Sequence, residues 1–265
     1  MTTKTRGVPE AKKHEGPGAK KHGRRHWLPN QHGAWAMLAV PFLAGMLLGS
    51  PRWTHLPLFV AWLAGYVAAF HAQQWVRLRR IARNPRAPRR HVRPGLVAGA
   101  VCGVFGVPLL WPYPWLLLAA ACALPFMAVN VAYAARNKER ALVNGLVAVV
   151  PACGMLLVAC HLGGGSPADA RRPALACLLY FAGTVPYVKT MIRERGSRTY
   201  YRASVTYHVL AVAAAYALSP WLAPLFAAYA LRAALLPGKG LKVAVVGATE
   251  VVGSLLLLGA LVVLF

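Results

Sequence analysis

Nine apolar segments follow one another along the chain, and they restrict it to one class of fold. The chain has 265 residues, of which 58% are hydrophobic, and its mean hydropathy is +0.47. A helix needs roughly 20 apolar residues to cross the hydrocarbon core of a bilayer. The sequence therefore predicts an all-α polytopic membrane bundle of about nine transmembrane helices, near residues 33–49, 56–76, 95–111, 114–135, 142–162, 173–191, 203–219, 220–236 and 242–265.

The first part of the chain has a different composition and forms a separate region. Residues 1–26 consist largely of Lys, His, Gly and Pro, with too few apolar side chains to build a core. Such a segment is expected to be disordered, and its positive charge attracts anionic lipid headgroups. The predicted organisation is a disordered basic tail at 1–26 and a transmembrane domain at 27–265.

The positions of the basic residues predict the orientation in the membrane. With the N-terminus inside, 27 of the 30 Lys and Arg residues fall on the cytoplasmic side, and only Arg52, Arg171 and Arg172 fall outside. Positive charge accumulates on the cytoplasmic side of membrane proteins. We expect a multi-pass protein of the cell membrane with a cytoplasmic N-terminus and an external C-terminus.

The net charge of +24 would suggest nucleic acid as a partner for a soluble protein. Here the bases lie between apolar segments and no nucleic-acid-binding motif is present, so the expected partner is the lipid bilayer. The five cysteines lie in apolar segments, without a CxxC pair or a His at metal spacing. We interpret them as small core side chains and expect no metal site and no cofactor.

One polar stretch, GTVPYVKTMIRERGSR at residues 183–198, ends the sixth segment. It carries Lys189, Arg193 and Glu194 close to an apolar helix, where charge is costly unless it faces protein or water. The simple interpretation is a helix end whose basic side chains reach the lipid surface. The interpretation that we favour is a binding site for these three residues.

Polar residues gather at several other segment ends on the same predicted side. In lipid each of them needs a partner, although a single Asn such as Asn144 often just bonds to a neighbouring helix. Together they predict a cationic cavity open to the cytoplasm, with Glu139, Glu194 and Glu250 as partial counter-charges. The predicted ligand-binding residues are His32, His71, Gln74, Arg77, Asn137, Glu139, Arg140, Lys189, Arg193, Glu194 and Lys242.

The chemistry of these residues indicates an anion. Arg and Lys outnumber the acids, and they bind phosphate and carboxylate groups with charge-assisted hydrogen bonds. No pair of carboxylates has the spacing for acid–base catalysis, so Glu194 is only a candidate for orienting the cations or acting as a base. The expected ligand is a phosphate-bearing or lipid-linked anion, held without magnesium. The alternative is a transporter or an accessory factor for a small anion.

Three stretches resemble the YwiC-like family of membrane proteins: LPNQHGAWAML at 28–38, RNKERALVN at 136–144 and YVKTMIRERG at 187–196. That family has no settled activity. The layout is also distantly similar to the UbiA superfamily of prenyltransferases, in which nine helices carry two aspartate-rich motifs at the ends of helices 2 and 6. The corresponding stretches here, 71–80 and 188–196, contain no aspartate. This second resemblance therefore implies a UbiA-like bundle and a divergent transferase without its magnesium diphosphate site.

Overall fold

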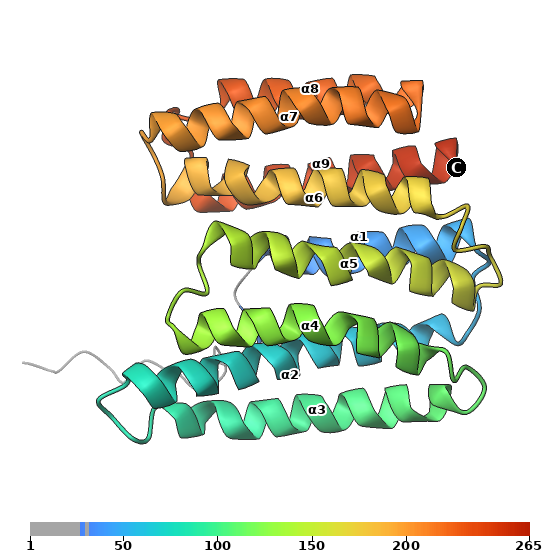
Figure 1. The fold of residues 1–265 in the computed structure, drawn as a ribbon, viewed down its shortest axis with the longest axis vertical. Helices are drawn as coiled ribbons and strands as arrows, with labels where there is room; N and C mark the ends of the chain where they lie inside the picture. Colours follow the sequence, from blue (N-terminus) through green and yellow to red (C-terminus); the bar gives the residue numbers. More distant parts are fainter. Residues whose placement is uncertain (1–26, 30–31) are drawn as a thin grey trace, which may run out of the picture.

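A computed structural model describes residues 27–29 and 32–265, and the backbone alone for His32. The predicted tail at 1–26 lies outside these residues. The described part of the chain is all helical (Figure 1). Its elements are α1 His32–Leu48, α2 His55–Ile81, η1 Pro88–His91, α3 Val92–Gly106, η2 Val107–Leu110, α4 Leu116–Ala135, α5 Leu142–Leu162, α6 Arg171–Ile192, α7 Arg198–Leu218, η3 Pro220–Leu222, α8 Ala223–Leu235 and α9 Val243–Leu264.

The helices lie side by side, and consecutive helices run in opposite directions (Figure 1). Helix α3 forms one edge of the bundle and packs on α2, and the α7–α8 pair forms the opposite edge. Between these edges, α1 and α5 lie in the middle, α4 packs on α2 and α5, and α9 packs on α1 and α6. The prediction of nine helices is confirmed for the described residues.

Helices α1 and α5 approach each other closely, and two glycines make this approach possible. A Cβ atom built on Gly45 would overlap the backbone carbonyl of Leu156, and one on Gly49 would lie 2.6 Å from the carbonyl oxygen of Cys160. Gly49 directly follows α1 and lies four residues after Gly45, so the two glycines face the same side. This is the small-residue packing by which helices approach closely in membranes.

Six helical segments of the described chain are long and apolar enough to cross a membrane: α2, α3 with its flanking 3₁₀ turns, α4, α5, α6 and α9. Helices α1 and α8 have 17 and 13 residues, and α7 begins with a polar turn. Large apolar side chains such as Val104 and Leu118 are more than two-thirds exposed on the outer surface, as lipid contact requires. The chain is therefore an integral membrane protein; nine crossings and the orientation of the termini stay predictions.

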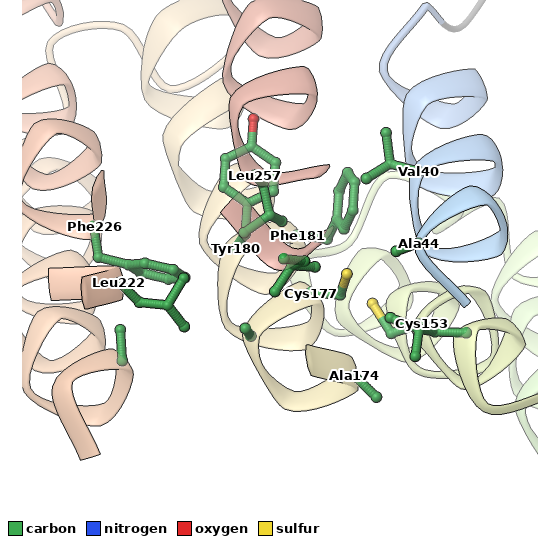
Figure 2. Close-up of a cluster of buried hydrophobic side chains, with 14 of the residues drawn as sticks. Val40, Ala44, Cys153, Ala174, Cys177, Tyr180, Phe181, Leu222, Phe226 and Leu257 are labelled. Carbon is green, nitrogen blue, oxygen red and sulfur yellow. The ribbon is translucent and has the colours of Figure 1, made fainter. Parts of the chain in front are cut away.

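Buried apolar side chains connect the central helices with α8 and α9. Figure 2 shows part of this core, with Val40 and Ala44 from α1, Cys153 from α5, Phe181 from α6 and Leu257 from α9. Three of the five cysteines, at 153, 160 and 177, are buried there as free thiols, which confirms their predicted role. The prediction is wrong for Cys122, which is exposed because most of α4 faces outward.

Candidate functional site

The connections α2–α3, α4–α5 and α6–α7 lie at the same end of the bundle (Figure 1). We call this the basic end, because residues 82–91, 136–141 and 193–197 are rich in Arg and Lys. Antiparallel neighbours turn at alternate ends, so the even-numbered helices all finish here. This topology brings together residues that are far apart in the sequence.

Arg77, near the end of α2, links that helix to the α4–α5 turn. Its Nη1 atom lies 3.2 Å from Glu139 Oε1, and its Nε donates a hydrogen bond of 2.7 Å to Asn137 Oδ1. Nη1 also donates to Gln74 Oε1, at 3.4 Å, one turn earlier on α2. The side chains of Arg77 and Glu139 are 25% and 18% exposed, so the contact is open to water at one side.

The α4–α5 turn has a defined geometry that explains these contacts. Helix α4 ends at Ala135, and Asn137 adopts a φ of 56°. The N–H of Asn137 donates to Ala134 O at 2.9 Å, and the N–H of Lys138 donates to Tyr133 O at 2.8 Å. This is a Schellman motif, in which Asn replaces the usual glycine. The turn thereby presents Asn137 and Glu139 to α2.

Helix α6 brings two more cations to the same turn. Lys189 Nζ donates a hydrogen bond of 2.8 Å to the backbone carbonyl of Arg140, whose own Nε lies 3.8 Å from Glu139 Oε1. Burial and then the charge of Arg140 lower the pKa of Arg193, while Glu139 opposes this shift. Arg193 therefore lies within electrostatic reach of the turn. We call Gln74, Arg77, Asn137, Glu139, Arg140, Lys189 and Arg193 the basic cluster.

Among the described residues, the side chains of His71, Glu194 and Lys242 show no contact with the side chains of the basic cluster. His71 is buried; its Nε2 lies 3.1 Å from Trp27 O and its Nδ1 lies 2.9 Å from His91 Nδ1, so it anchors the segment before α1. Lys242 is exposed just before α9, and Glu194 forms no ion pair within the described residues. The side chain of His32 lies outside the described residues.

A second charged pair lies inside the bundle, and the sequence reasoning assigned it wrongly. We expected Glu250 to be a partial counter-charge of the cytoplasmic cavity, and Arg232 was one of the 27 bases assigned to the cytoplasmic side. Instead Arg232 belongs to α8, and its Nη1 donates to Glu250 Oε1 of α9 at 2.5 Å. The guanidinium carbon lies 4.3 Å from the ring centre of Tyr187. A cation inside an apolar segment was the signal that could have identified this pair.

Two hollows are present among the described residues, and both lie away from the basic cluster. One, of about 260 Å³, lies near Trp53 and Tyr113, and the other, of about 730 Å³, is an open groove between α7 and α8 near Val209 and Ala227. Apolar side chains dominate both linings, and neither lining includes a residue of the basic cluster. The cationic interior cavity stays a prediction, and the basic cluster is a partly exposed surface.

The residues present do not fit a magnesium diphosphate site. Magnesium prefers hard oxygen ligands, usually carboxylates together with phosphates and water. No group of three or more His, Cys, Asp and Glu side chains gathers in the part of the chain that the structure describes. The carboxylate of the basic cluster, Glu139, already faces Arg77 and Arg140. The cluster is suited to binding an anion directly.

The positive φ of Asn137 predicts that two substitutions at this position differ in their effect on stability. Glycine keeps the left-handed backbone and loses the bond to Arg77, whereas alanine loses the bond and adds a backbone strain of about 1 kcal/mol. We expect Asn137→Ala to be less stable than Asn137→Gly by that amount, measured by unfolding in mixed micelles with increasing dodecyl sulfate. Equal stability of the two variants would contradict the positive φ of Asn137.

Comparison with known proteins finds one family model and two relatives that are similar to this chain. The family model described as "YwiC-like protein" matches residues 28–160. The chain is 32% identical over 237 residues to "Uncharacterized protein YwiC" of Bacillus subtilis (strain 168), which covers 86% of this chain and 93% of that protein. It is also 32% identical over 234 residues to an "Uncharacterized protein" of Haemophilus influenzae (strain ATCC 51907 / DSM 11121 / KW20 / Rd), covering 84% and 92%.

No solved structure matches the chain, so the distant similarity to the UbiA superfamily stays a prediction. The family model ends inside α5, but the two relatives extend the similarity over most of the bundle, including α6 with Lys189 and Arg193. On this evidence the chain belongs to the YwiC-like family of proteins.

Proposed function

We propose that this membrane protein binds a phosphate-bearing anion at the basic cluster, on the cytoplasmic side of the membrane. The observation that carries the proposal is the imbalance of charge. Arg77, Arg140, Lys189 and Arg193 come from three separate parts of the chain, whereas one carboxylate, that of Glu139, contacts two of them, Arg77 and Arg140. Arg forks and Lys point charges are the usual protein ligands of phosphate.

The location supports a lipid-linked ligand. The cluster lies where α2 and α6 end, beside the apolar surface of the bundle. A molecule with a phosphate head and an apolar chain would place the head on the cations and the chain in lipid. An isoprenoid diphosphate has this form, and the distant UbiA similarity makes a divergent transferase the second part of the proposal. Glu139, which contacts the cations, is better placed than Glu194 to assist such a site.

We expect farnesyl diphosphate and inorganic pyrophosphate both to stabilise the purified full chain in detergent, with EDTA present. Arg193→Ala should weaken binding roughly tenfold, because it removes one charge-assisted contact. Arg172→Ala is the matched control, since Arg172 is exposed at the opposite end of the same helix. Thermal unfolding and titration calorimetry measure both effects.

The arms of this experiment separate the alternatives. Much tighter binding of farnesyl diphosphate than of pyrophosphate supports a lipid-linked ligand, and equal binding supports a free anion. Stabilisation that appears only with magnesium would contradict the metal-free site. Flux of phosphate into vesicles that contain the protein, abolished by Arg193→Ala, would instead identify the anion transporter.

A further inference from the structure

We infer that the Glu139 carboxylate occupies the place of the ligand's phosphate group, and that the ligand binds by displacing it. This inference rests on the proposed function and deepens it: Glu139 is an internal competitor, and the ligand group is a phosphate with more than one negative charge. Three features of the basic cluster lead to it.

The first feature is that Glu139 is held loosely. Its Oε1 accepts from Arg77 at 3.2 Å and lies 3.8 Å from Arg140 Nε, whereas good charge-assisted bonds between these groups measure roughly 2.7–2.9 Å. Neither pair is bidentate, and the other carboxylate oxygen, Oε2, is buried without a hydrogen-bond partner among the described residues. An unpartnered buried oxygen is unfavourable. The carboxylate therefore loses little when it leaves this position.

The second feature is that other groups hold Arg77 and the backbone of the turn. Arg77 keeps its bonds to Asn137 Oδ1 and Gln74 Oε1 when Glu139 moves. The backbone of Arg140 is held by Lys189, and the Schellman motif fixes the turn. Only a rotation of the Glu139 side chain is needed: Arg77 stays in place, and the Arg140 side chain, which is 68% exposed, can turn toward another oxyanion.

The third feature is the amount of positive charge around the Glu139 carboxylate. With Glu139 displaced, a phosphate would face Arg77 and Arg140 directly, with Lys189 and Arg193 beside them. A carboxylate ligand would only replace one negative charge by another. A phosphate monoester or diphosphate adds charge, and it offers several oxygens to guanidinium groups on different elements. The exchange therefore favours phosphate over carboxylate.

The test compares Glu139→Gln with Glu194→Gln. Both remove one negative charge from the basic end, but only Glu139 contacts Arg77 and Arg140. We expect Glu139→Gln to bind pyrophosphate roughly three- to tenfold more tightly than the unmodified chain, the range of a partly exposed ion pair. Glu194→Gln should change the affinity less than twofold. Acetate should compete weakly in every variant. Titration calorimetry on the full chain in detergent measures these affinities.

Weaker or unchanged binding by Glu139→Gln, with the unmodified chain binding normally, would overturn the inference and give Glu139 a positioning role. Equal tightening by both variants would also overturn it, since net charge alone would then explain the gain. If no variant binds pyrophosphate or farnesyl diphosphate, the proposed function itself fails. If Glu139→Gln does not fold, Glu139→Asp provides the same comparison, because it retains the charge but reaches less far. Pyrophosphate binding by Glu139→Asp that is no tighter than binding by the unmodified chain would then overturn the inference.

Discussion

Glu250→Ala is expected to destabilise the folded protein by about 3–5 kcal/mol, as the loss of one partner from a buried ion pair does. The side chains of Arg232 and Glu250 are only 12% and 7% exposed, and the pair lies within the bundle between α8 and α9. Without Glu250, the guanidinium would remain against the rings of Tyr187 and Tyr229 with no counter-charge. Unfolding in mixed micelles, followed by circular dichroism, measures the loss.

The matched control replaces both partners. The double variant Arg232→Met with Glu250→Leu removes both buried charges and fills the space with apolar atoms, which is often close to neutral. We expect it to be clearly more stable than Glu250→Ala. If Glu250→Ala and the double variant lose the same free energy, the charge of Arg232 is not the cause. If Glu250→Ala loses less than about 1 kcal/mol, the pair is accessible to water.

Gly45→Ala is expected to cost about 3 kcal/mol or more, at the upper end of overpacking effects. The added Cβ meets the backbone carbonyl of Leu156, and no change of rotamer relieves an overlap with backbone. Helices α1 and α5 would have to separate along their whole contact. Gly259→Ala on α9 is the control, because a Cβ there has no atom within 4 Å.

Gly259→Ala should leave stability unchanged or raise it by up to about 1 kcal/mol, since alanine is the better helix former. The same micelle unfolding experiment compares the two variants. A mild effect of Gly45→Ala, within about 1 kcal/mol of the control, would show that α1 and α5 do not pack at this distance.

Much of the fold is predictable because apolar runs in lipid have few alternatives to the helix. The fifth predicted segment, 142–162, coincides with α5. Differences occur where polar residues continue a helix: α2 extends to Ile81 through Arg77, Arg79 and Arg80, and α7 begins at Arg198. Hydropathy does not detect such turns, whereas Ser197, which accepts a hydrogen bond from Tyr200 N, is a recognisable helix cap.

The basic cluster was predictable in outline, because cations lie in or directly after the last turn of α2, α4 and α6, at one end of the bundle. Which side chains of the cluster pair with one another was not predictable. Arg77 contacts Asn137 and Glu139, which lie 60 residues or more further along the sequence, through packing that no local pattern specifies. Arg232 shows the same limit: its place in the predicted helix at 220–236 does not reveal that Glu250 of α9 is its partner. Sequence spacing located the charges, and tertiary contacts decided their partners.

The glycine contact between α1 and α5 also has a consequence for synthesis in the cell. The glycine face of α1 packs on α5, whereas other parts of α1 contact α2: Trp62 Nε1 donates a hydrogen bond of 3.2 Å to Leu38 O, and the ring centres of Phe42 and Phe59 lie 4.7 Å apart. Leu162, the last residue of α5, is made 114 residues after Leu48. At translation rates of about 5–20 residues per second, the glycine face of α1 has to wait roughly 6 to 23 seconds for α5. During this interval the glycine face of α1 has no α5 to pack on, and it is available to lipid or to the insertion machinery.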